Sequence, residues 1–161
     1  MAQKTALVLK DNASVAMDPA LVGVNGPAIL ETWFPGQEDG NIVADLVFGK
    51  VNPSGKLPVT FPFAGKGFLD NATDVQYPGK LSGDGVTNTV EYLEKLHIGY
   101  RWYDGNISGQ CAVANGVNPC VAFPFGHGLS YTTFSTTNTS VAANGSKYEV
   151  KATVKNTGAM A

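Results

Sequence analysis

The acidic pair Glu38-Asp39 is the first group in the chain whose types and spacing suggest chemistry. Two neighbouring carboxyl groups can serve as a general acid and a general base. The same residues stand in the first turn of an expected helix, where carboxylates are favoured by the helix dipole and by unpaired N–H groups. We therefore favour a role at the helix end over a catalytic one.

His127 and Ser130 resemble a nucleophile and its base by residue type only. They lie too close together on one loop to form a hydrolase pair, and the chain has no G-x-S-x-G elbow. His127 also lacks a cysteine, an aspartate or a second histidine at metal-ligand spacing, and its flanking glycines indicate a backbone turn. A structural linker is the favoured interpretation.

Arg101 is the single arginine of the chain and is surrounded by aromatic residues in the segment GYRWYD. Such a group can stack on a sugar ring and bind its hydroxyls. It can equally form a packed seam in which the guanidinium pairs with a carboxylate such as Asp104. We favour the seam.

The two cysteines, Cys111 and Cys120, lie in a polar loop rich in glycine and asparagine. No second cysteine pair is present, so a zinc site would lack ligands and no metal is expected. A local disulfide is favoured over two free thiols, since exposed loop cysteines persist as bridges mainly in oxidising compartments.

Composition excludes two classes of partner for this chain of 161 residues. A formal net charge of −2 and a charged fraction of 15% leave no basic footprint for nucleic acid or for a membrane surface. No apolar run approaches the roughly 20 residues needed to cross a bilayer. The opening residues contain too short an apolar stretch for a signal peptide, so we expect any export signal to lie upstream or to have been removed.

The first third of the sequence predicts strand, turn and helix. Residues 5–9 and 28–34 are apolar runs without helical period, as in strands buried on both faces. The second run ends at Pro35-Gly36, which does not fit inside a central strand. Over residues 37–48 the apolar positions form one helical stripe, and Gly49 supplies the stop.

The remainder is less regular until the final segment. Residues 52–62 contain three prolines and are expected to run as an extended strap rather than to pair inside a sheet. Residues 65–88 read as a long excursion, and residues 98–104 as a strand or a hooked turn. Residues 131–134 and 148–155 alternate apolar with polar around a turn at 143–146, which predicts antiparallel strands and the opening of a larger β-sandwich.

Three segments carry a family resemblance in their order and spacing: AILETWFPGQEDGNIVADLVFGKVNPSGKLPVTFP, GYRWYD and FPFGHGLSYTTF. Together they resemble the C-terminal part of glycoside hydrolase family 3, the β-glucosidase and β-xylosidase type. The resemblance runs from about Thr5 to Gly158. It implies an α/β fold class: a C-terminal fragment of an α/β sandwich domain over residues 1–129, followed over residues 130–161 by the first strands of an incomplete Ig-like (fibronectin type III-like) β-sandwich.

The resemblance also implies a mechanism for the intact parent. That enzyme would hydrolyse terminal β-linked glucose or xylose from small oligosaccharides or aryl glycosides, by a retaining reaction without cofactor. The reaction uses two carboxylates about 5 to 5.5 Å apart. In the family the nucleophile lies on a (β/α)8 barrel and the acid/base lies well before the PGQE turn, so both are expected to be absent here and the isolated chain to be inactive.

Substrate-binding candidates follow from the turn that precedes the expected helix. It comes after the carboxyl end of a strand, where open α/β sheets place ligands, so Trp33, Gln37 and Glu38 are expected to approach the substrate cleft of the complete enzyme. The resemblance places that enzyme outside the cell or in the periplasm, with the missing upstream barrel as partner. The alternative is a non-catalytic accessory module that binds carbohydrate or protein through its aromatic segment.

Overall fold

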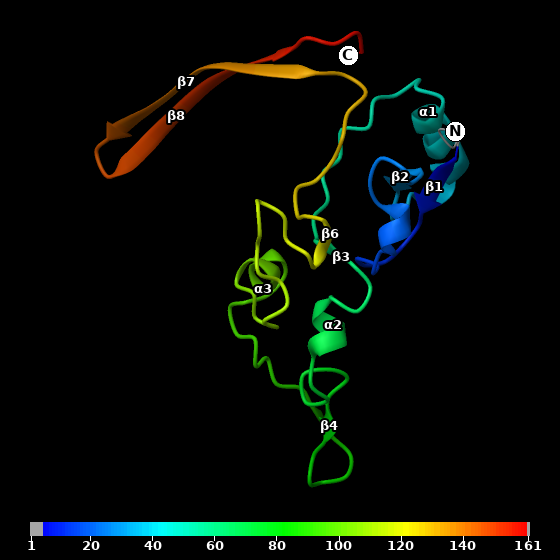
Figure 1. Cartoon of the computed structure of the whole chain (residues 1–161), viewed down its shortest axis with the longest axis vertical. Helices are drawn as coiled ribbons and strands as arrows, with labels where there is room; N and C mark the ends of the chain where they lie inside the picture. Colours follow the sequence, from blue (N-terminus) through cyan, green and yellow to red (C-terminus); the bar gives the residue numbers. More distant parts are fainter. Residues whose placement is uncertain (1–4, 161) are drawn as a thin grey trace. The chain divides into compact units, whose positions relative to one another are not determined.

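The computed structural model describes residues 5–160 (Figure 1). These residues divide into two units that alternate along the chain. The first unit comprises the described residues up to Gly36 together with Lys56–His127. The second comprises Gln37–Gly55 together with the described residues from Gly128 onward.

The first unit opens with a parallel pair of strands, β1 (Ala6–Leu9) and β2 (Ala28–Glu31). Their register runs from Ala6 opposite Ala28 to Leu9 opposite Glu31, and a short 3-10 helix, η1 (Pro19–Leu21), lies in the connection. Both expected strands are present, but neither is buried on both faces as the sequence suggested, because each contains only exposed and half-buried residues. The second ends three residues early, because Thr32 makes the last ladder contact, from its N–H to the Leu9 carbonyl at 3.0 Å.

The proline-rich strap is partly paired, contrary to the expectation from its prolines. Within it β3 (Phe61–Pro62) pairs antiparallel with β6 (Val121–Phe123) across an irregular register. The Phe61 side chain is only 2% exposed, so burial of this aromatic ring decides the outcome. A two-residue strand tolerates Pro62 because its carbonyl is still free to accept, here from the Met17 N–H at 2.8 Å.

A disulfide-centred core lies further along the first unit. The Cys111–Cys120 bond packs against Trp102 and Tyr103, and all four residues are buried. The two aromatic residues belong to α3 (Tyr100–Asp104), so the strand interpretation of residues 98–104 was wrong. A single helical turn brings adjacent aromatic rings to one core, whereas a strand would point them to opposite faces.

Two smaller elements occupy the excursion in the first unit. Helix α2 (Phe68–Asn71) places the Phe68 ring edge-on to Trp102, with 6.0 Å between ring centroids. Strands β4 (Lys80–Leu81) and β5 (Asn88–Thr89) form a short hairpin. Its turn is held by the Asp84 carboxylate, which accepts from the N–H groups of Val86 and Thr87.

The second unit contains the expected helix and the expected antiparallel strands. A 3-10 turn, η2 (Gly36–Glu38), leads into α1 (Asp39–Val47), which ends before Gly49 at φ +72°. Strands β7 (Phe134–Asn144) and β8 (Lys147–Asn156) run side by side as a hairpin (Figure 1). The first of these strands begins at Phe134 rather than at Tyr131, because the Asn52 side chain accepts the Tyr131 N–H at 2.8 Å.

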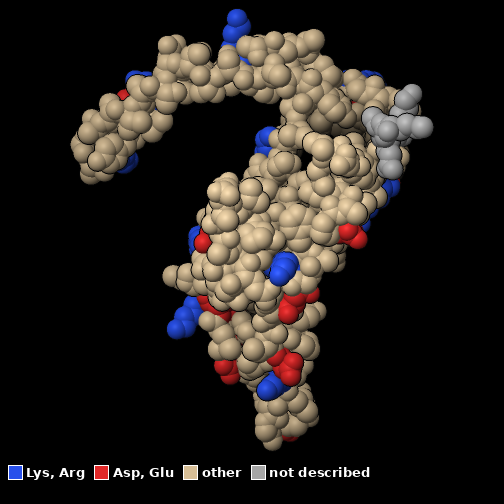
Figure 2. All heavy atoms as spheres, in the orientation of Figure 1, with Lys and Arg blue, Asp and Glu red and all other residues tan. Residues whose placement is uncertain are grey.

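Charge is sparse and mixed over the surface. Figure 2 shows lysine and arginine side chains interspersed with aspartate and glutamate on the face drawn, without a large field of one sign. None of the helices in residues 5–160 has the length and apolar character needed to span a membrane.

Candidate functional site

The carboxyl end of the β1–β2 pair is the part of the first unit that best fits a binding edge. Asp11 follows β1 and Glu31 closes β2, and each carboxylate has one buried oxygen, Oδ2 and Oε2, without a hydrogen-bond partner among the described residues. Buried polar atoms normally find partners, so these two oxygens are exceptions that mark the edge. The other Glu31 oxygen accepts the Trp33 N–H at 2.7 Å.

Trp33 holds an unusual backbone conformation at this edge. Its φ is +52°, in the left-handed region that bulky residues avoid. Such strain costs about 1–3 kcal/mol and clusters at functional sites. The hydrogen bond from the Trp33 N–H to Glu31 compensates part of that cost and turns the chain toward Pro35-Gly36.

The Trp33 ring is half-buried and packs on the side of the buried Phe61 ring. The ring centroids are 6.0 Å apart and the planes are inclined by 55°. One part of the indole therefore stabilises the protein interior and the rest remains accessible. This geometry suits the wall of a binding site better than an open stacking platform.

Gln37 and Glu38 lie in the second unit, whereas Trp33 lies in the first. Both side chains are exposed. Glu38 occupies the N-cap position of α1 without a side-chain bond to the helix backbone, and its Oε2 accepts from the Asn41 amide at 2.7 Å. Glu38 therefore stands at the helix end, as expected, but its side chain does not cap the helix backbone. The exposed Glu38 carboxylate and Gln37 amide are available for polar contacts.

His127 acts through its backbone and its ring packing. Its carbonyl accepts the Leu57 N–H at 2.8 Å, and the Leu57 carbonyl in turn accepts the Gly126 N–H at 2.8 Å. The imidazole lies 5.1 Å from the Phe123 ring, centroid to centroid. These contacts fit the structural linker expected from the flanking glycines.

Arg101 lies against the ring of its neighbour Tyr100 rather than pairing with Asp104. Its guanidinium donates to the Leu96 carbonyl at 3.4 Å and lies 5.7 Å from the centre of the Tyr100 ring. The Tyr100 ring in turn lies 5.2 Å from the Phe125 ring, with both side chains about half exposed. The result is a small exposed aromatic surface, and within residues 5–160 Arg101 forms no ion pair with Asp104.

The disulfide loop is fixed by side-chain amides rather than by charge. Asn106 Oδ1 accepts the Cys111 N–H at 2.6 Å, and Asn118 Oδ1 accepts the Cys120 N–H at 3.0 Å. The pKa of the Tyr103 phenol is raised, mainly by burial against this core. In the described part of the chain, no group of three or more histidine, cysteine, aspartate or glutamate residues is arranged to hold a metal ion.

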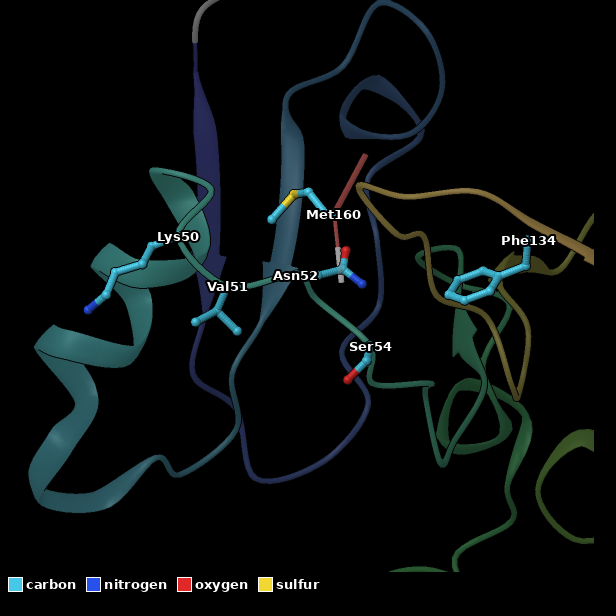
Figure 3. Close-up of a pocket in the computed structure, with 6 residues that line it drawn as sticks. All are labelled: Lys50, Val51, Asn52, Ser54, Phe134 and Met160. Atoms are coloured by element: carbon cyan, nitrogen blue, oxygen red, sulfur yellow. The ribbon is translucent and has the colours of Figure 1, made fainter. Parts of the chain in front are cut away.

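An open hollow of about 500 Å³ lies in the second unit (Figure 3). Its lining residues are mostly polar or aliphatic: Lys50, Val51, Asn52, Ser54, Phe134 and Met160. Figure 3 shows Lys50 pointing away from Asn52, and its ammonium group binds both Asp45 oxygens at 3.0 Å. The lining therefore offers no carboxylate for acid or base chemistry.

The sequence made Trp33, Gln37 and Glu38 candidates, and the structure adds Asp11 and Glu31 to them. The signal was present, because both acidic residues stand at the carboxyl ends of two expected parallel strands. Taken together, the arrangement can accept hydrogen bonds from hydroxyl-rich ligands and can offer an aromatic wall. Among the described residues, the contacts of this arrangement do not identify a general acid paired with a general base.

Comparison with known proteins gives a consistent result. The family described as Glycosyl hydrolase family 3 C-terminal domain matches residues 1–131. The chain is similar to Beta-glucosidase B of Emericella nidulans, with 41% identity over 139 residues that cover 83% of this chain and 15% of the relative. It is also similar to Thermostable beta-glucosidase B of Acetivibrio thermocellus, with 40% identity over 138 residues covering 83% and 16%.

Solved structures agree with the sequence relatives. DesR, a beta-glucosidase from Streptomyces venezuelae solved in complex with D-glucose, matches with a TM-score of 0.71 and 37% identity, covering 95% of this chain and 17% of that one. The beta-glucosidase of Kluyveromyces marxianus, also in complex with glucose, matches with a TM-score of 0.70 and 32% identity, covering 96% and 16%. The chain thus spans about one sixth of the length of these relatives, and by sequence and fold it belongs to the glycosyl hydrolase family 3 C-terminal domain family.

Proposed function

We propose that this chain is the C-terminal α/β portion of a β-glucosidase-like retaining glycoside hydrolase and serves as its supporting and substrate-lining part. The observation that carries the proposal is the 41% identity to a beta-glucosidase, with a match to a glucose complex at a TM-score of 0.71. The substrate class would be terminal β-linked glucose or xylose in small oligosaccharides or aryl glycosides, and no cofactor would be needed.

The proposed division of labour places both catalytic carboxylates outside these residues. Glu38 is exposed and bonded to Asn41, and Glu31 binds a backbone N–H within its own turn. The chain would then contribute Trp33, Gln37 and Glu38 to the rim of a sugar site whose reacting groups lie on an upstream barrel.

We also propose a domain boundary near residue 130. Residues 1–129 would complete the α/β domain, and residues 130–161 would open a fibronectin type III-like β-sandwich. Two observations support this: the family match ends at residue 131, and the long hairpin strands begin at Phe134. The buried disulfide supports an extracellular or periplasmic location, where such bonds persist.

The isolated chain provides the first test. Purified protein should give no hydrolysis of aryl β-glucosides above background, because loss of even one essential group costs several powers of ten in rate. Glu31→Gln, Glu38→Gln and Asp39→Asn variants serve as controls. Turnover by the unmodified chain that one of these substitutions abolishes would overturn the placement of the carboxylates.

A chimera provides the positive test. The corresponding segment of the Acetivibrio thermocellus enzyme would be replaced by the aligned residues of this chain, and activity on aryl β-glucosides measured. We expect an active chimera. Trp33→Ala should then raise KM severalfold, while Tyr92→Ala, at an exposed aromatic residue that follows β5, leaves KM unchanged. A folded but inactive chimera, or equal effects of the two substitutions, would refute the substrate-lining role.

A second candidate function rests on the Tyr100–Phe125 surface. Two half-exposed rings 5.2 Å apart with Arg101 beside them suit the apolar face and hydroxyl groups of a pyranose. If the chain is instead an accessory binding module, the isolated protein should bind soluble β-glucans, and Tyr100→Ala should abolish binding. Calorimetric titration distinguishes this from the hydrolase role, which requires no affinity in the isolated chain.

A further inference from the structure

Asparagine is followed directly by glycine at three places in the chain, each of them at a turn: Asn25-Gly26, Asn115-Gly116 and Asn144-Gly145. Such a pair can modify itself, because the main-chain nitrogen of the glycine can attack the side-chain amide carbon of the asparagine. Glycine favours the attack, since it has no Cβ to restrict the backbone or obstruct the approach. In a folded chain the reaction then depends on how freely the peptide unit between the two residues can rotate.

Asn115 and Gly116 are the two central residues of a tight turn within the disulfide loop. Their φ values are +53° and +76°, and two positive values in succession are the signature of a type I′ turn. Two bonds close the turn, from the Ala114 N–H to the Val117 carbonyl and from the Val117 N–H to the Ala114 carbonyl, each at 3.0 Å. The peptide unit that joins Asn115 to Gly116 takes no part in either bond.

That peptide unit is free to rotate. Among residues 5–160, neither the Gly116 N–H, the Asn115 carbonyl nor the Asn115 side-chain amide has a hydrogen-bond partner, and both residues are exposed. A type I′ turn converts to a type II′ turn by rotation of this one unit, while the residues that close the turn stay in place. The Gly116 nitrogen can therefore change its orientation toward the Asn115 side chain without breaking the bonds of the turn.

The Asn25-Gly26 pair lacks this freedom. The Gly26 N–H, which would be the attacking group, donates to the Gly23 carbonyl at 3.1 Å. A methyl group at Gly26 would overlap the Leu21 carbonyl, so the backbone is closely packed at this point. Attack on the Asn25 side chain therefore requires this turn to open first.

The Asn144-Gly145 pair is constrained in a different way. Asn144 is the last residue of β7 and pairs with Lys147 across the hairpin turn. Rotation of the peptide unit after Asn144 would turn its carbonyl out of the ladder and cost the hydrogen bonding of that pair. Asn144 and Asn115 are both preceded by alanine and followed by glycine, so the two sites differ in their fold and not in their nearest neighbours.

We propose that Asn115 is a site of spontaneous deamidation in the folded chain, whereas Asn25 and Asn144 are protected by their turns. The Gly116 nitrogen gives up its proton to solvent and forms a bond to the Asn115 Cγ. The bond from Cγ to the side-chain nitrogen breaks, and ammonia leaves with a proton returned by solvent. Water then opens the cyclic succinimide at either carbonyl, which gives aspartate or isoaspartate and adds a negative charge to the loop. The inference goes beyond the proposed glycosidase role and does not depend on it.

Peptide mapping by tandem mass spectrometry tests the proposal. The chain, with its disulfide intact, is held at mildly alkaline pH, and loss of the amide is followed at each of the three asparagines. Asn115 should react at least about fivefold faster than Asn25 or Asn144, because each of these must first lose a hydrogen bond or a ladder pair. In the reduced chain in urea the three rates should agree within about threefold, because the turns are then absent.

Asn115→Asp supplies the matched variant, because aspartate tolerates the same left-handed backbone and has no amide to lose. It should remove the fast phase of ammonia release and leave the rates at Asn25 and Asn144 unchanged. Isoaspartate at position 115 identifies attack by the Gly116 nitrogen, since direct hydrolysis of the side-chain amide gives aspartate alone. Equal rates at Asn115 and Asn144 in the folded chain, the same ratio of rates in urea, or aspartate as the sole product would overturn the proposal.

Discussion

Replacing both Cys111 and Cys120 with alanine tests how the core of the first unit is held. The bond closes a loop with a sequence separation of 9, and in the chain-entropy description a loop of that size contributes about 3 kcal/mol. Both cysteines are 0% exposed and pack on Trp102 and Tyr103, so removing the sulfurs also leaves a cavity costing on the order of 1 kcal/mol. We expect the free energy of unfolding to fall by about 4 kcal/mol.

Urea denaturation followed by tryptophan fluorescence provides the assay, because Trp102 lies in the cluster that loosens. Reduction of the disulfide in the unmodified chain should lower the free energy of unfolding by the loop-closure contribution alone, because no cavity is created. Val117→Ala, a substitution at an exposed position inside the same loop, should change stability by less than about 0.5 kcal/mol. A loss below about 1 kcal/mol in the double variant, or an equal loss in Val117→Ala, would refute the reasoning.

Three further outcomes are expected. Gly158→Ala should destabilise the base of the β7–β8 hairpin by about 1–3 kcal/mol in urea unfolding, because the added methyl group would lie 2.7 Å from the Thr133 backbone nitrogen; an unchanged midpoint would contradict this. Bonds from Thr87 lower the pKa of Asp84 from 3.8 to about 2, so the β4–β5 turn should stay formed well below pH 3.8 and open as the pH falls through about 2. An NMR titration of the Thr87 amide checks this, and a midpoint at the ordinary value would exclude it. Burial raises the pKa of the Tyr103 phenol, so the stability contributed by its neutral form should persist through pH 10 and be lost only above it. The absorbance of the phenolate, measured as the pH is raised, checks this prediction, and a titration at the ordinary pKa of tyrosine would contradict it.

Local signals in the sequence were sufficient for several elements. The apolar runs around Leu7 and Ile29 became parallel strands, and the helical stripe before Gly49 became α1 with a left-handed residue after its end. Each depends on neighbours within a few positions, such as a terminating Pro35-Gly36 or a glycine stop. The hairpin turn around Gly145, at φ +62°, was equally local.

Long-range burial decided the elements that sequence reasoning misplaced. The GYRWYD segment folded into one helical turn because Trp102 and Tyr103 share a core with a disulfide eight to eighteen positions away along the chain. The Phe61 strand formed because its ring is buried, although its neighbours are prolines. Propensity is a weak predictor where tertiary packing opposes it.

The candidate site was predictable in part. Its position at the end of a strand made Trp33 a candidate, but its positive φ and its contact with Phe61 depend on the folded chain. The buried, unpartnered oxygens of Asp11 and Glu31 could not be read from residue type, because the same carboxylates on a solvated loop would find water instead.

The reciprocal bonds between Leu57 and the Gly126–His127 turn have a consequence for the order of folding. They close the large loop of the first unit, and the chain leaves that loop at both ends directly into the second unit. Contacts of the second unit such as Ser130 with Asn52, 78 positions apart, would otherwise require closing that whole span from the unfolded chain. Once the first unit has folded, the two ends emerge as neighbours and the remaining search is short. Folding of the first unit therefore shortens the loop that the contact between Asn52 and Ser130 has to close.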